Sequence, residues 1–196
     1  MNDTSNYGLL RAEIAAAAAR MIVEDGIDYG AAKRKSARQL LGHDRARREL
    51  LPDNAQIEDE VRLYNQLFLA DRQPARLRAL RELAVELMEQ LASFRPYLVG
   101  AVQNGTAGQH SDIHLQLFPD NPKEVAFFLL DQQIRFETSE SAAAAPHLPP
   151  IETLSFIWRG EGVHLALHGA NDLRTGKKAR QRADLTAARR LCSEQT

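Results

Sequence analysis

The feature that most constrains this fold is a change in hydrophobic period near Pro96. Before Pro96, apolar residues recur every three or four positions, the spacing of one face of an amphipathic helix. After it they recur at every second position, as in a half-buried strand. We therefore expect an α+β protein: an N-terminal helical lobe over residues 1–95, then a small mixed β-sheet with flanking helices over residues 96–196, together forming one compact unit.

Helix signals fill the first half of the chain. Four segments with helical apolar stripes are expected: residues 8–25, 31–41, 54–71 and a segment that opens at Pro74. Gly26 and Gly42 follow the first two segments, where glycine commonly ends a helix. Asp53 and Gln56 have the spacing of a capping box, which predicts a helix start directly after Asp53.

Strand signals follow Pro96. Strands are expected at residues 97–104, 112–118, 134–138, 153–158 and 163–168, with helices at 123–132 and 184–192. Turn residues separate the first two strands, so we expect them to be neighbours in one sheet, with Gly105 and Thr106 in their connection. The Ala/Pro-rich segment 141–150 is expected to be a surface loop.

Composition excludes several classes of protein. The hydrophobic share is 44%, which is enough apolar surface for a folded core. Cys192 is the single cysteine, which excludes an internal disulfide and any multi-cysteine metal site, and which suits a reducing cytoplasm. The longest run of low polarity covers only residues 14–19, so no membrane partner is expected and we predict a cytoplasmic protein.

A glycine-threonine turn leads into a strand that begins with a carboxylate. A glycine lets the backbone approach a phosphate closely, and the Thr106 hydroxyl and nearby N–H groups can donate to phosphate oxygens. Asp112, at the start of the next strand, is placed to hold a divalent cation on those phosphates. The pattern predicts phosphate binding at Gly105 and Thr106 and metal binding at Asp112.

This segment resembles the nucleotidyltransferase superfamily, which carries a Gly-Ser, Gly-Gly or Gly-Thr pair after a strand and Asp-hydrophobic-Asp on the next strand. The matching positions are Gly105-Thr106 and Asp112-Ile113-His114, and Glu137 is the candidate third carboxylate. The resemblance implies a nucleotidyltransferase-like fold over residues 97–138. It also implies transfer of a nucleoside monophosphate from a nucleoside triphosphate to an acceptor hydroxyl.

That resemblance assigns roles to residues. Asp112 would hold magnesium or manganese, His114 or Glu137 would assist it, and Gly105 with Thr106 would cradle the nucleotide phosphates. The sequence departs from the family pattern at His114, where an imidazole replaces the second carboxylate. A neutral imidazole suits zinc or manganese better than magnesium. The competing hypothesis is a non-catalytic binding module with a degenerate nucleotidyltransferase fold, which contacts RNA or a protein partner.

The whole chain also resembles a family of short bacterial proteins often labelled UDP-N-acetylmuramate–alanine ligase. Three shared segments carry this resemblance: residues 24–29, 32–35 and 111–118. The residues argue against the label, because such ligases resemble three-domain ATP-using enzymes of more than twice this length. A phosphate loop of the form G-x-x-x-x-G-K-[ST] is also absent from the sequence.

Histidines suggest a second kind of site. His110, Asp112 and His114 alternate along an extended segment, and His164 and His168 lie four positions apart on a later predicted strand. If the two strands are neighbours, these imidazoles and the carboxylate converge as nitrogen and oxygen ligands for zinc or a similar metal. The alternative is a half-exposed polar sheet face on which the imidazoles meet water.

Basic residues gather in two runs, at 33–48 and 174–182. Such runs can hold the phosphates of a nucleic acid or nucleotide. The alternative, which we favour, is a solvated helix face and a disordered loop, the usual outcome for such runs. No aromatic side chain interleaves the basic residues, so base stacking is not indicated. Nucleophilic catalysis finds little support: Ser111 lies between His110 and Asp112, but adjacent strand residues point to opposite faces, so these three form no triad.

Overall fold

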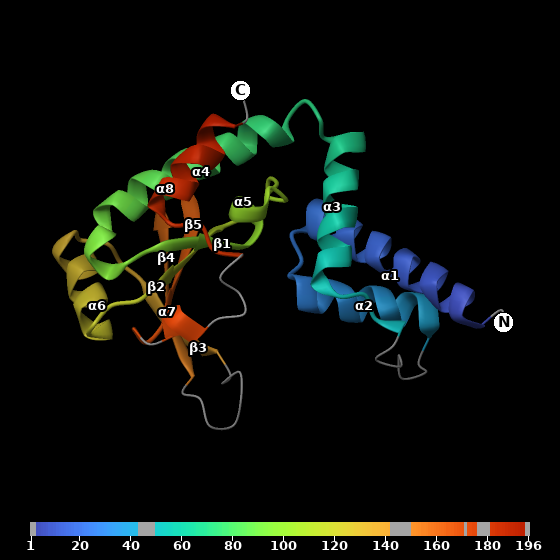
Figure 1. Ribbon diagram of the computed structural model, residues 1–196, viewed down its shortest axis with the longest axis horizontal. Coiled ribbons are helices and arrows are strands. Elements are labelled where there is room, and N and C mark those ends of the chain that lie inside the picture. Colours follow the sequence, from blue (N-terminus) through green and yellow to red (C-terminus); the bar gives the residue numbers. More distant parts are fainter. Residues whose placement is uncertain (1–2, 43–49, 142–149, 171, 176–180, 195–196) are drawn as a thin grey trace. The chain divides into compact units, whose positions relative to one another are not determined.

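The computed structural model describes residues 3–42, 50–141, 150–170, 172–175 and 181–194 of the chain (Figure 1). Contacts divide the chain into two compact units, residues 1–74 with 108–110 and residues 75–107 with 111–196. The expected α+β class is confirmed, since helices come first and a mixed sheet with helices follows. We predicted a lobe boundary near Pro96, where the hydrophobic period changes. In the structure, most of helix α4 (Gln73–Gln90) belongs to the same compact unit as the sheet.

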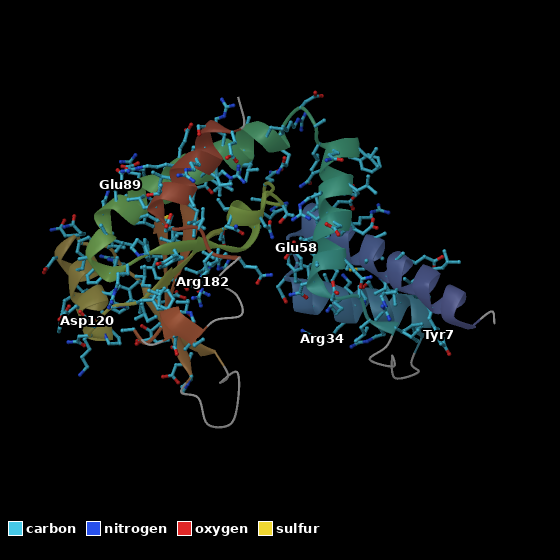
Figure 2. The ribbon with its side chains drawn as sticks, in the orientation of Figure 1. Tyr7, Arg34, Glu58, Glu89, Asp120 and Arg182 are labelled. Carbon is cyan, nitrogen blue, oxygen red and sulfur yellow. The ribbon has the colours of Figure 1, made fainter. Side chains whose placement is uncertain are left out.

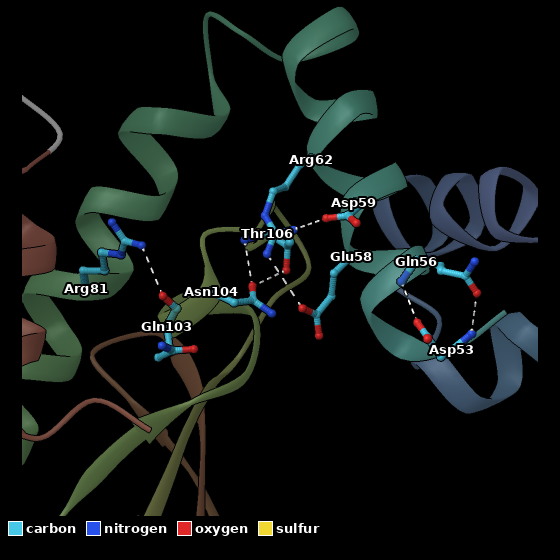
Figure 3. A network of polar contacts seen from close by, with 9 residues as sticks. All are labelled: Asp53, Gln56, Glu58, Asp59, Arg62, Arg81, Gln103, Asn104 and Thr106. Carbon is cyan, nitrogen blue, oxygen red and sulfur yellow. Dashed lines mark hydrogen bonds and ion pairs between the residues drawn. The ribbon is translucent and has the colours of Figure 1, made fainter. Parts of the chain in front are cut away.

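The described residues of the first unit form helices α1 (Asp3–Asp25), α2 (Tyr29–Leu41) and α3 (Asn54–Phe68). Gly26 and Gly42 follow α1 and α2 with φ of 66° and 69°, a conformation that glycine adopts without strain. The Asp53 side chain accepts a hydrogen bond from the Gln56 backbone N–H, and the Gln56 side chain accepts one from the Asp53 N–H (Figure 3). The predicted helix ends and the capping box are therefore confirmed.

Small side chains fill the core of this unit. The buried residues are mainly alanines of α1 and α2 that meet two branched residues of α3: Ala15, Ala18, Ala19, Ala32, Ile57 and Val61. Alanine is the best helix former, and its short side chain lets helices approach closely. The alanine run in the sequence is thus a packing surface within this unit.

The second unit is built on a five-stranded sheet. Its strands are β1 (Tyr97–Val99), β2 (Ile113–Leu117), β3 (Glu137–Ser141), β4 (Ile151–Trp158) and β5 (Glu161–Leu167). The spatial order is β1-β2-β5-β4-β3, and the β2–β5 pair is parallel while the other pairs are antiparallel. The prediction that the first two strands are neighbours, with Gly105 and Thr106 in the connection, is confirmed.

Helices α4 (Gln73–Gln90), α6 (Pro122–Asp131) and α8 (Leu185–Ser193) pack against one face of this sheet. The core between them is aliphatic and fully buried; it includes Leu80, Leu87, Met88, Val125, Leu129, Ile113, Leu115, Val163 and Leu165. An ion pair of 2.7 Å between Arg189 of α8 and Glu89 of α4 lies at the surface of this layer (Figure 2). The alternate strand residues, which point away from these helices, are less buried.

Some sequence predictions were wrong in detail. The expected strand 97–104 ends at Val99, because Gly100 has φ of 72° and residues Gly100–Asn104 form a short helix, α5. Strand β3 begins at Glu137, so residues 134–136 precede it. A short helix α7 (Asp172–Thr175) was not predicted. The predicted loop 141–150 lies mostly outside the described residues.

Candidate functional site

Strand register assembles a row of side chains across the sheet. His114 of β2 pairs with His164 of β5, His164 pairs with Ser155 of β4, and Ser155 pairs with Glu137 of β3. Paired residues of neighbouring strands point to the same face of a sheet. This face is the one opposite α4, α6 and α8, and we call it the polar face. The prediction that the strands of His114 and His164 are neighbours is confirmed.

Asp112 joins this row from the turn before β2. Its Oδ2 lies 3.1 Å from Nε2 of His164, whose Nδ1 lies 2.9 Å from the Ser155 hydroxyl. Gly162 makes room for the carboxylate, because a Cβ at that position would lie 2.4 Å from Asp112 Oδ1. The placement of Asp112 therefore depends on a glycine in the neighbouring strand, which the sequence did not single out.

His114 stacks on His164. Their ring centroids are 4.7 Å apart and the planes differ by 18°. Burial, followed by the nearby His164, lowers the pKa of His114, while the Asp112 carboxylate acts in the opposite direction. His114 is therefore held in its neutral form at neutral pH.

A bidentate ion pair lies beside this cluster. Arg76 of α4 contacts both carboxylate oxygens of Glu161, at 2.5 and 2.6 Å. The hydrogen bond from Arg76 lowers the pKa of Glu161, and the same bond raises the pKa of Arg76. The negative charge of Asp112 also raises the pKa of Arg76, so the carboxylate lies within the field of this cation.

The other predicted site residues lie elsewhere. Glu137 belongs to the row, but it lies on the edge strand β3. Strands β4 and β5 lie between β3 and β2, so Glu137 is not adjacent to Asp112. His168 follows β5 and stacks on Phe118 at 5.4 Å. His110 belongs to the first compact unit, where its Cβ lies 2.8 Å from the position that a Cβ on Gly26 would take. Convergence of His110 and His168 with Asp112 stays a prediction.

The glycine-threonine turn closes helix α5. Gly105 caps the helix with φ of 86°, and Thr106 is buried. The Thr106 N–H and hydroxyl both donate to the Asn104 side-chain oxygen, at 3.0 and 2.7 Å (Figure 3). The residue directly after β1 is instead Gly100, where an added Cβ would lie 3.9 Å from the His114 side chain. The phosphate-binding role predicted for Gly105 and Thr106 stays a prediction, and Gly100 is the glycine closer to His114.

The donor set does not fit an ordinary magnesium site. Within the described part of the chain, no group of three or more His, Cys, Asp or Glu side chains is arranged to hold a metal ion. Of the two carboxylates in the row, Asp112 contacts His164 through its Oδ2, and Glu137 lies on the edge strand β3. Magnesium prefers several oxygen ligands in octahedral geometry.

The basic runs are only partly described. Lys33, Arg34, Lys35 and Arg38 lie on α2, where Arg34 is exposed (Figure 2). Residues 43–49 and 176–180, which hold most of the remaining cations, lie outside the described residues. Arg182 stacks over the Phe118 ring at 5.0 Å from its centroid. Among the helices of the described residues, none is long and apolar enough to span a bilayer.

Comparisons with known proteins give weak similarities. No protein-family model matches the chain, and no curated protein matches it. One similar solved structure is that of Cid1, whose title names its RNA terminal uridylyl transferase activity. The sequence identity is 18% and the TM-score is 0.33, and the match covers 57% of this chain and 36% of the Cid1 chain. The GLD-2/RNP-8 complex matches at 17% identity and 0.32, covering 70% of this chain and 52% of that one.

A third solved structure, of the non-canonical poly(A) polymerase complex GLD-2–GLD-3, matches at 18% identity and a TM-score of 0.32, covering 71% of this chain and 44% of that one. This chain thus spans between about a third and about half of the length of the solved chains it matches. All three similarities are low.

Proposed function

We propose that this protein is a nucleotidyltransferase-like module that binds a nucleotide without ordinary magnesium-dependent transfer. One observation supports this most: His114 and His164 are paired on adjacent strands, and in the described part of the chain no group of three carboxylate, imidazole or thiol side chains around Asp112 could hold a metal ion. Nucleotidyl transfer in the two-metal form needs several carboxylates around the ions. Imidazoles do not supply that negative charge.

The side chains of the row favour binding of a nucleoside over binding of a bare phosphate, because they offer a hydrogen-bond acceptor and flat rings. The Asp112 carboxylate accepts hydrogen bonds, and an exposed carboxylate of this kind can accept from sugar hydroxyls. The rings of His114 and His164 are flat and stacked, and His114 is held neutral. A ligand that offers hydroxyl groups and a flat base matches these properties.

The finer hypothesis is transfer of a nucleoside monophosphate to an acceptor hydroxyl, with Asp112 assisted by His114 or Glu137. Its third carboxylate, Glu137, stands on β3 at the far edge of the sheet from β2. We therefore keep transfer as the second candidate, to be decided by the same experiment.

The test is calorimetric titration of ATP with EDTA, magnesium or manganese, alongside an assay for transfer from an α-labelled nucleoside triphosphate. The variants are Asp112→Ala and His114→Asp, and the matched control is Asp131→Ala, an exposed carboxylate on α6. We expect wild type to bind ATP without needing magnesium, with any metal-dependent part larger for manganese, because imidazole nitrogen suits manganese better than magnesium. His114→Asp should increase magnesium dependence by adding a second carboxylate.

Two results would contradict the proposal. The first is label transfer by wild type that disappears in Asp112→Ala but persists in Asp131→Ala, which would establish the second candidate. The second is the absence of ATP binding by a folded wild-type protein under every metal condition. In that case the polar face serves another partner, of which RNA and protein are the alternatives.

A further inference from the structure

Three side chains from neighbouring strands form a continuous hydrogen-bonded relay on the polar face. The Ser155 hydroxyl lies 2.9 Å from Nδ1 of His164, and Nε2 of His164 lies 3.1 Å from Oδ2 of Asp112. The residues are far apart in sequence and meet because β4 and β2 both flank β5. Serine, histidine and carboxylate in this order are the parts of an activated nucleophile, recognised by geometry and not by chain order.

Proton positions in this relay follow from the donors available. An ionised carboxylate only accepts hydrogen bonds, so the Asp112 contact requires a proton on Nε2 of His164. In a neutral imidazole the other nitrogen, Nδ1, is then an acceptor. The Ser155 hydroxyl must donate to Nδ1, so its oxygen lone pairs are left free to attack an electrophile.

Packing holds the relay in place. Ser155 and His164 are direct partners in the β4–β5 register, so their side chains leave the sheet side by side. Asp112 occupies the space beside Gly162 that any larger residue would fill. The side chains of His164 and Asp112 remain 32% and 46% exposed, which leaves the relay open to small molecules.

We propose that Ser155 is a nucleophile for acyl transfer from activated carboxylic esters, with His164 as its general base and Asp112 as the positioning residue. The Ser155 oxygen bonds to the ester carbonyl carbon while its proton moves to Nδ1 of His164. The bond to the leaving oxygen then breaks, and that oxygen takes the proton from Nδ1. Water, deprotonated by His164, hydrolyses the acyl-serine, so that ester and water become acid and alcohol.

The choice of activated esters follows from the backbone. Ser155 is paired on both sides, with His164 on β5 and Glu137 on β3, so its strand is engaged in two ladders. Backbone N–H groups in a ladder are not available to stabilise an oxyanion, and amide hydrolysis depends strongly on such donors. A substrate with a good leaving group, such as an aryl ester, needs that stabilisation least.

The experiment uses p-nitrophenyl acetate, in the absence of nucleotide and metal. Release of p-nitrophenolate gives the rate, and mass spectrometry of the protein and its peptides locates the acetyl group. We expect one acetyl on Ser155 in wild type, none at that position in Ser155→Ala, and an acylation rate at least about 100-fold lower in His164→Gln. The matched control is Ser139→Ala, which removes an exposed serine of β3 and should acylate like wild type.

Gly162→Ala provides a variant that keeps all three polar groups. Its Cβ would displace the Asp112 carboxylate, so the acylation rate should fall about as far as in Asp112→Asn while circular dichroism stays that of wild type. The proposal is overturned if folded wild type gains no acetyl on Ser155, or if Ser155 acylates equally fast in His164→Gln. Because no nucleotide takes part, these outcomes are independent of ATP binding.

Discussion

Arg81 of α4 links three helices of the sheet unit, and its removal is the sharpest test of how that unit is held together. Its side chain is buried, at 4% exposure. The guanidinium donates to the carbonyls of Val102 at 3.1 Å and Gln103 at 3.4 Å, both in α5, and of Leu191 at 2.9 Å in α8 (Figure 3 shows the Gln103 contact). These carbonyls lie near helix C-termini, where they lack partners within the helix. Burial lowers the pKa of Arg81, which marks the dehydration of its charge.

The cost of Arg81→Met follows from these contacts. The two shorter hydrogen bonds have a charged donor, and such bonds contribute about 1.5–3 kcal/mol each. Part of that loss is offset, because the buried guanidinium no longer has to be dehydrated. We expect the free energy of unfolding to fall by about 3 kcal/mol, which for a chain of this size lowers Tm by roughly 6–12 °C.

Urea denaturation followed by circular dichroism measures this effect. The matched control is Arg189→Met, which removes a 57% exposed arginine whose partner is Glu89 at 2.7 Å. That variant should change the free energy of unfolding by less than about 1 kcal/mol, as exposed pairs do. A loss below about 1 kcal/mol for Arg81→Met would refute the view that these carbonyls depend on the guanidinium.

Two further perturbations test the protonation of His114 and the ion pair between Arg76 and Glu161. Because the pKa of His114 is lowered in the folded state, the unfolded chain binds its proton more readily, so the free energy of unfolding should fall as pH drops below about 6.5. Urea titrations at several pH values should show a weaker fall in His114→Gln, and an identical pH dependence would contradict this. For the half-buried Arg76–Glu161 pair, a double-mutant cycle with Arg76→Met and Glu161→Gln should give a coupling free energy of about 1–2 kcal/mol. A coupling near zero would show that the bidentate contact does not form in solution.

The sequence predicted local structure where a local signal exists. The capping box at Asp53 predicted the start of α3, because its hydrogen bonds join residues only three positions apart. The glycines after α1 and α2 predicted where those helices end, because glycine adopts a positive φ there without strain. The strand 97–104 failed at Gly100, whose positive φ starts a helix that alternation of side chains does not reveal. An apolar helical stripe also does not specify its partner, so nothing in the pattern placed α4 against the sheet.

The candidate site could not be predicted in full, because it depends on the order of the strands in the sheet. The alternation of apolar and polar residues along a strand does not specify that order. Residues 112, 114 and 164 were singled out by residue type, and the pairing of β2 with β5 brought His114 beside His164. Ser155 and Gly162 gave no signal, because serine and glycine are ordinary residues in a strand and its turn. The separation of Glu137 from Asp112 likewise follows from the strand order, because β5 and β4 lie between β2 and β3.

Asp112 takes part in both proposals, and a cation bound to its carboxylate would be incompatible with the relay. In the relay, its Oδ2 accepts from His164, and that contact fixes the tautomer that lets Ser155 donate to Nδ1. A cation held by the same carboxylate would compete with the Nε2 proton and repel the imidazolium that forms during acyl transfer. The contact between Asp112 and His164 therefore favours a carboxylate that orients an imidazole over a carboxylate that holds a metal.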